Sequence, residues 1–144
     1  MKTVLMPPTM GQILRAWWPD HLDRAVPGPK LRPVFYLGQT RIADAAYWVV
    51  AYGTSQCSQE KECRNGGDLY VACSDNASMV LQSDTRFDFN QIQAIPASEE
   101  YFPVDRQSGK VRSVDLPASL FAVAVECMRY ANVPGTLRKL GVVV

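Results

Sequence analysis

The sequence is poor in the residues that build metal and acid–base sites. Its 144 residues include one histidine, His21, and four cysteines, Cys57, Cys63, Cys73 and Cys127. Cys57 and Cys63 are too far apart for the tight CxxC-type spacing of a zinc site, and His21 is distant from both in the sequence. We therefore expect no metal and no cofactor, and thiols that stay reduced.

Long apolar segments are also missing. No stretch approaches the roughly 20 apolar residues that a transmembrane helix needs. The N-terminal sequence MKTVLMPPTMGQ lacks the apolar run of a secretory signal. We expect a cytoplasmic protein with no membrane partner.

Net charge is close to zero, at +1, so composition alone points to no charged partner. The distribution is uneven, because residues 51–105 hold three Lys/Arg against nine Asp/Glu, whereas residues 106–144 hold six against two. Binding to a polyanion would therefore depend on a local basic patch.

β-strand signals dominate the chain. Segments rich in β-branched and aromatic residues, separated by turn-forming residues, predict strands at 12–18, 32–38, 46–52, 68–73, 78–82 and 85–95. Pro33 has no N–H to donate, so it can stand only at the start or edge of a strand. Because neighbours in a strand face opposite ways, one of Trp17 and Trp18 is expected in the core.

One helix is predicted near the C-terminus, with Asp115 as its cap, Pro117 in its first turn and Leu120, Phe121, Ala124 and Met128 on its apolar face. An irregular insert, at about 96–113, precedes it. We expect a single mainly-β domain over 1–144, built on a small, curved antiparallel sheet or partial barrel.

Two cations, Lys30 and Arg32, stand where a Pro/Gly-rich loop enters the strand-like VFYLG. Around them, several short motifs occur in a fixed order: MGQILRAWWP, KLRPVFYLG, YGTSQ, NQIQAI and SGKVRSVDLPASLFAVAVECM. In this order they resemble the MazF/PemK (Kid) toxins of toxin–antitoxin pairs. The resemblance covers roughly residues 10–132, with Gln12 in place of the family's usual acidic residue.

That resemblance implies an SH3-like or CcdB-like barrel that forms a homodimer. It also implies a metal-independent endoribonuclease that cuts single-stranded RNA by attack of a ribose 2′-hydroxyl on the adjacent phosphate. An antitoxin protein would neutralise it, and a plasmid or phage would be a natural source.

The resemblance places Arg32 and Thr54 at the reacting phosphate. A guanidinium can meet two phosphate oxygens at once, and Pro33 would hold Arg32 rigidly. Thr54 would hydrogen-bond the phosphate or orient the nucleophile, while Lys30 and Gln56 would contact RNA. The alternatives are a surface cation guarding a strand edge for Arg32 and a turn-stabilising hydroxyl for Thr54.

The residue that would accept the proton is either Asp88 or His21, and the sequence does not decide between them. Some family members carry an R-x-D-Q acid–base pair, and Arg86-x-Asp88 recovers that pair with a shift of two residues. Strand alternation predicts that Arg86, Asp88 and Asn90 share one face, with Arg86 and Asn90 contacting RNA.

Two other functions remain open. A CcdB-like toxin that binds gyrase would share the architecture, but such toxins often end in Trp-Gly-Ile and this chain ends in LRKLGVVV. The third hypothesis is a catalytically inactive barrel that binds RNA or protein as an adaptor or regulator.

Overall fold

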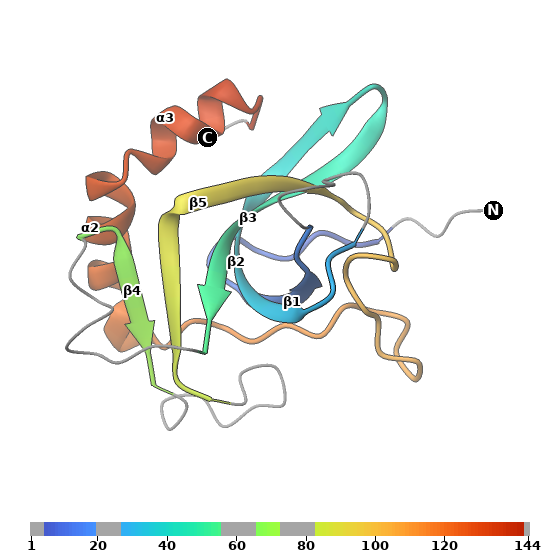
Figure 1. The fold of residues 1–144 in the computed structure, drawn as a ribbon, viewed down its shortest axis with the longest axis horizontal. Helices are drawn as coiled ribbons and strands as arrows, with labels where there is room; N and C mark the ends of the chain where they lie inside the picture. The colour runs from blue at the N-terminus through green and yellow to red at the C-terminus, as the bar shows by residue number, and fades with distance from the viewer. Residues whose placement is uncertain (1–4, 20–26, 56–65, 73–82, 143–144) are drawn as a thin grey trace.

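The computed structural model describes residues 5–19, 27–55, 66–72 and 83–142. In this part of the chain, five strands form one antiparallel sheet in the order β1-β2-β3-β5-β4. Their bounds are β1 Ile13–Trp17, β2 Leu31–Ile42, β3 Ala45–Thr54, β4 Asp68–Val71 and β5 Thr85–Pro96. The sheet is open, with β1 and β4 at its edges (Figure 1).

The mainly-β prediction is confirmed, and each predicted strand within the described ranges is present. The observed β2 and β3 extend beyond the predicted 32–38 and 46–52 and form a long hairpin. The strand predicted at 78–82 lies outside the described residues. Pro33 stands near the start of β2 and pairs with Arg15 of β1. The pairing of β2 with β3 begins only at the next residue, Val34, which is consistent with the missing N–H of Pro33.

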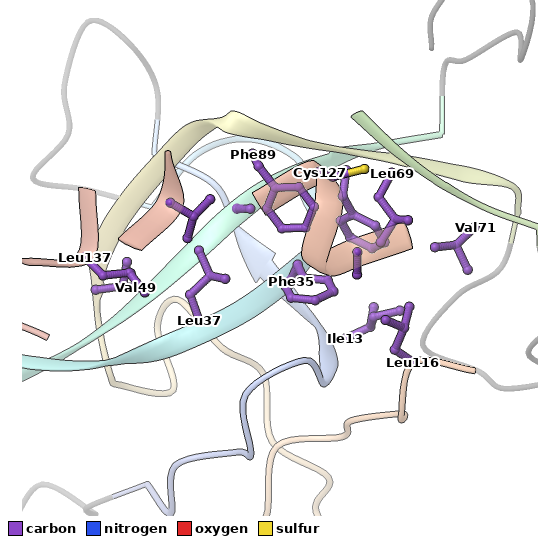
Figure 2. Packing of buried hydrophobic residues seen from close by; sticks show 14 of the residues in the cluster. Ile13, Phe35, Leu37, Val49, Leu69, Val71, Phe89, Leu116, Cys127 and Leu137 are labelled. Atoms are coloured by element: carbon purple, nitrogen blue, oxygen red, sulfur yellow. The ribbon is translucent and has the colours of Figure 1, made fainter. Parts of the chain in front are cut away.

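One face of the sheet is covered by the C-terminal helices (Figures 1 and 2). Phe35 of β2 lies at its centre and packs edge-on against Phe87 and Phe89 of β5, with ring centroids 5.8 and 5.0 Å apart. Leu137 and Cys127 reach the same cluster from the helices. The cluster of buried residues on this face is the larger of the two apolar cores.

The opposite face is covered by the insert that follows β5. Trp48 and Phe102 are fully buried there, with ring centroids 4.7 Å apart. Trp17 donates its backbone N–H to the carbonyl of Tyr101 at 2.8 Å, so the insert also binds the outer edge of β1. One of the two neighbouring tryptophans was predicted to be in the core, and it is Trp18 that is buried. Both faces of the sheet are thus apolar, and different segments close them.

The C-terminal region departs from the single predicted helix. In the described residues it forms a short 3₁₀ turn, η2 Ala118–Leu120, followed by α2 Phe121–Tyr130 and α3 Val133–Lys139. The break falls at Asn132, whose φ of 54° is left-handed and cannot continue a helix. No helix in the described ranges is both long enough and apolar enough to cross a lipid bilayer.

Two details of the helix prediction are wrong. Asp115 does not cap it, because α2 begins six residues later and its N-cap, Leu120, makes no side-chain cap hydrogen bond. Asp115 instead accepts a hydrogen bond from Gln12 Nε2 at 2.9 Å, which ties the segment before the helix to the start of β1. Phe121 was expected in the core, yet its side chain is 54% exposed.

Candidate functional site

A cleft of about 230 Å³ opens at one end of the sheet, beside the face that the insert covers. Its lining combines two cations, two aromatic rings, an amide and two prolines: Lys30, Arg32, Trp18, Tyr52, Gln91, Pro19 and Pro29. These residues come from the ends of β1, β2 and β3, from the adjoining loops and from β5. Cations next to aromatic faces form a surface suited to a phosphate and the base attached to it.

Arg32 is held in this cleft by its strand and by an aromatic ring. It pairs with Ala16 of β1, and its guanidinium carbon lies 5.1 Å from the centroid of the Tyr52 ring. No carboxylate in the described ranges forms an ion pair with it. A guanidinium over the face of a ring is held there by cation–π attraction and still has N–H groups that can bind an anion, two at a time.

Trp18 and Tyr52 form the aromatic wall of the cleft. Their ring centroids are 5.1 Å apart with an interplanar angle of 74°, an edge-to-face contact. Trp18 is largely buried, so its position is fixed by the core, while Tyr52 is only partly buried. Lys30 is exposed beside them and adds a second positive charge.

Thr54 lies on the same face as Arg32. It is the last residue of β3, is 5% exposed, and pairs with Arg86 of β5. Val34 pairs with Tyr52, so continuing the antiparallel register by two residues sets Arg32 opposite Thr54. Strands β2 and β3 remain close together beyond their last pair. This closeness is seen at Gly53, where an added Cβ would collide with the carbonyl oxygen of Pro33.

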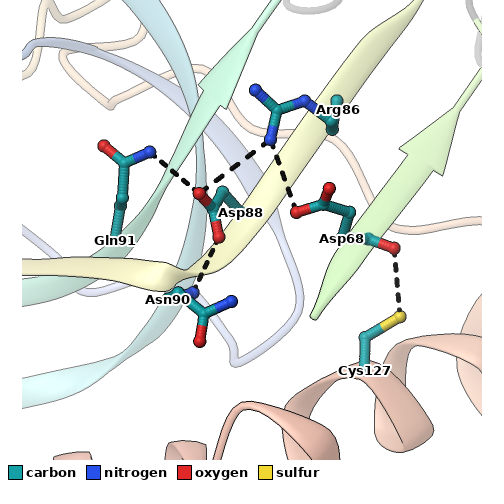
Figure 3. A network of polar contacts seen from close by, with 6 residues as sticks. All are labelled: Asp68, Arg86, Asp88, Asn90, Gln91 and Cys127. Carbon is teal, nitrogen blue, oxygen red and sulfur yellow. Dashed lines mark hydrogen bonds and ion pairs between the residues drawn. The ribbon is translucent and has the colours of Figure 1, made fainter. Parts of the chain in front are cut away.

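Figure 3 shows a cluster of charged side chains around Arg86 and Asp88. These two residues pair with Thr54 and Tyr52 of β3, respectively. Arg86 Nη1 lies 3.4 Å from Asp68 Oδ1 and 3.9 Å from Asp88 Oδ2. The side chains of Arg86, Asp68 and Asp88 are only 15%, 4% and 13% exposed. One guanidinium thus neutralises part of the charge of two carboxylates in a poorly solvated place.

Asp88 makes further contacts that hold both of its oxygens. Oδ1 accepts the backbone N–H of Asn90 at 2.9 Å, and Oδ2 accepts Nε2 of Gln91 at 2.8 Å. Asp88 is not part of the cleft lining; Gln91 stands between it and the cleft. The carboxylate expected to accept a proton is therefore engaged in a structural network.

The prediction that Asn90 shares a face with Arg86 and Asp88 is wrong. The register between β3 and β5 shifts after the Tyr52–Asp88 pair and resumes at Ala51 and Ile92, so the residues between Asp88 and Ile92 bulge out. The side-chain nitrogen of Asn90 lies only 2.7 Å from where a Cβ at Gly67 would be, toward the helices. Gln91 points to the opposite side and takes the place expected for Asn90 (Figure 3).

The structure thus brings Arg32, Thr54, Arg86 and Asp88 to one end of one face, with Lys30 beside them. His21 and Gln56 lie outside the described residues. Sequence reasoning missed Tyr52 and Asp68, and it assigned no role to Gln91. Tyr52 stands two residues before Thr54, so strand alternation alone indicated that the two share a face.

Within the described ranges, no group of three or more His, Cys, Asp or Glu side chains is placed to hold a metal ion. Cys127 is buried and its thiol lies 3.3 Å from the backbone oxygen of Asp68.

No protein-family model matches this chain, and the search of curated proteins gives no match.

Proposed function

We propose that this chain is an endoribonuclease of the MazF/PemK type that cuts single-stranded RNA without a metal ion. The observation that carries the proposal is the position of Arg32. Its guanidinium borders an open cleft, lies over the Tyr52 ring and shares a face of the sheet with Thr54. That is the arrangement needed to bind a phosphodiester in one fixed orientation.

The reaction builds negative charge on the phosphate. The ribose 2′-oxygen bonds to phosphorus, the bond from phosphorus to the 5′-oxygen breaks, and a proton passes from the 2′-hydroxyl to solvent or an acceptor while the 5′-oxygen gains one. Arg32 offers two parallel N–H donors to the non-bridging oxygens as this charge develops. Lys30 adds attraction for the neighbouring phosphates.

The aromatic wall supports a single-stranded substrate. Tyr52 is only partly buried and lies beside Arg32, with Trp18 packed edge-on against it. A base attached to the bound nucleotide can therefore contact the exposed part of the Tyr52 ring while its phosphate meets the guanidinium. A base inside a duplex is already stacked on its neighbours and has no face free for this contact. The cleft therefore favours an unpaired nucleotide.

The resemblance extends the proposal to an SH3-like barrel that acts as a homodimeric toxin and is blocked by an antitoxin protein. Several apolar side chains of α2 are about half exposed or more, among them Phe121, Val123, Val125 and Tyr130. Such a surface is of the kind that protein partners cover. The molar mass in solution, measured with and without an antitoxin peptide, tests this part.

The cleavage test uses the purified protein, a single-stranded RNA and EDTA. Fragments with 2′,3′-cyclic phosphate and 5′-hydroxyl ends are expected, and Arg32→Ala should abolish them. Arg41→Ala is the matched control, because Arg41 lies at the other end of β2 and, among the described residues, its side chain bonds only the Asp44 carbonyl of its own hairpin. Intact RNA with the wild-type protein would count directly against a nuclease.

A second candidate, an RNA-binding protein that does not cut, is favoured by one observation. Both oxygens of Asp88 are engaged and Gln91 separates it from the cleft, so the cleft lining in the described residues supplies no carboxylate to take the proton. RNA binding that depends on Arg32 but yields no fragments would select this candidate.

A further inference from the structure

The amide of Gln91 has a fixed orientation. Its Nε2 donates to Asp88 Oδ2 at 2.8 Å, and a carboxylate can only accept hydrogen bonds. The NH₂ group must therefore face Asp88, which leaves the carbonyl oxygen on the side away from that carboxylate (Figure 3). Within the described ranges this is the one side-chain hydrogen bond of Gln91.

Asp88 cannot easily release this constraint. Its other oxygen is occupied by the N–H of Asn90 at 2.9 Å, and Arg86 lies 3.9 Å from the oxygen that Gln91 contacts. Turning the amide over would set its carbonyl oxygen against a carboxylate oxygen, which is repulsive. The buried charge cluster thus dictates which end of an exposed amide is presented to solvent.

Gln91 is exposed and lines the cleft together with Arg32 and Tyr52. Because its NH₂ group is engaged by Asp88, the carbonyl oxygen is the end of the amide left for a ligand in the cleft. A ligand in the cleft therefore meets cations for its phosphate, aromatic rings for its base and a single directed acceptor. The acceptor is the only one of these features that distinguishes one base from another, since every base has a face that can stack.

We propose that Gln91 selects a nucleotide whose base carries an amino group at C4 of a pyrimidine or C6 of a purine, that is cytosine or adenine, at the position beside Arg32. This rests on the proposed function, in which the cleft binds single-stranded RNA. The amino group of cytosine can donate to the Gln91 carbonyl oxygen. Uracil places a carbonyl oxygen at the same point, so two acceptors would face one another.

The test compares 2′-O-methyl pentamers of cytidine and of uridine, which lack the attacking hydroxyl and cannot be cut. Fluorescence anisotropy should show about 3- to 10-fold tighter binding of the cytidine pentamer to the wild-type protein, the value of one hydrogen bond in an open site. Adenosine and inosine pentamers form a second matched pair, with adenosine bound more tightly.

Two variants make the test specific. Gln91→Met keeps the length of an exposed side chain but has no amide, and should bind both pentamers of each pair equally. Asp88→Asn should reverse the preference. Asn90 N–H keeps the new amide's oxygen on its own side, so its NH₂ group faces Gln91, whose amide then turns and offers NH₂ to the cleft.

The outcomes separate this inference from the function on which it rests. Equal binding of cytidine and uridine pentamers by the wild-type protein overturns the selection by Gln91 and leaves RNA binding intact. A cytidine preference that survives Gln91→Met, or that Asp88→Asn does not change, overturns it as well. No binding of any pentamer overturns both the inference and the proposed function.

Discussion

The guanidinium of Arg32 and the ring of Tyr52 lie 5.1 Å apart across neighbouring strands, and both border the same cleft. We expect this cation–π contact to restrict the rotamers of the Arg32 side chain before any ligand binds. The conformational entropy that the Arg32 side chain loses when a ligand binds is then smaller. For the proposed nuclease, we therefore expect catalysis to depend on the planar guanidinium of Arg32 and not merely on its positive charge.

The first prediction separates planarity from charge. Arg32→Lys keeps the charge but loses the two-pronged donor, so the rate of RNA cleavage should fall by about 10²–10³, the value of one directed donor. Initial rates on a fixed single-stranded RNA, at saturating concentration, measure this. A lysine variant as fast as the wild type would mean that Arg32 supplies only electrostatic attraction.

The second prediction concerns the buried charge cluster. Arg86→Met leaves Asp68 and Asp88 close together with little solvent, and we expect the free energy of unfolding to drop by about 3–5 kcal/mol. Urea denaturation measures the loss. Arg129→Met is the control, because its ion pair with Glu126 is exposed and should contribute less than about 0.5 kcal/mol.

The same cluster offers a second readout. Combining Arg86→Met with Asp88→Asn removes one of the stranded charges and should restore part of the lost stability. A double variant no more stable than Arg86→Met alone would show that the loss comes from packing and not from repulsion between Asp68 and Asp88.

The third prediction tests whether the insert is part of the core. Phe102 is fully buried against Trp48, so Phe102→Ala should lower the free energy of unfolding by about 3–5 kcal/mol. Gln107→Ala, in the exposed turn of the same insert, should change it by less than about 0.5 kcal/mol. Similar small effects for both would show that the insert is only a surface loop.

The fourth prediction is a pH dependence confined to that turn. The pKa of Asp105 is lowered, first by the backbone N–H of Gln107 and also by Arg112, whose Nε lies 3.1 Å from Oδ2. A lowered pKa means that the ionised form favours the folded turn. Its contribution is present above the pKa of the unfolded chain and is lost as the pH falls through the folded value.

NMR titration of the Asp105 carboxyl carbon should give a midpoint below that of an unfolded peptide. Asp105→Asn should remove the corresponding acid-induced change in the amide signals of Gln107. A midpoint at or above the peptide value would contradict the contacts of this turn.

Strand positions could be read from the sequence because β-branched and aromatic residues gather where both faces of the sheet are buried. Val49 and Val50 show this, since they serve opposite cores from neighbouring positions. The pairing of Thr54 with Arg86 was not deducible from local pattern, because register depends on contacts between distant segments. The motif resemblance nevertheless selected Arg32, Thr54 and Asp88, which the fold brings to one end of one face.

The failures have local causes. Strict alternation placed Asn90 with Asp88, but the bulge after Asp88 turned Asn90 away and brought Gln91 into its place. Asp115 was taken as a helix cap by residue type alone, and a competing partner, Gln12, lies 103 positions earlier in the chain. The separate helix α3 follows from the left-handed backbone at Asn132, a conformation that this residue type tolerates but does not require.

The order of segments along the chain has a consequence for synthesis on the ribosome. The strands come first, and the segments that cover the two apolar faces, the insert and helices α2 and α3, are translated only after β5. A nascent chain that has emerged only as far as β5 would expose apolar side chains on both faces of its sheet. We expect such intermediates to aggregate or to need a chaperone until the remaining residues arrive.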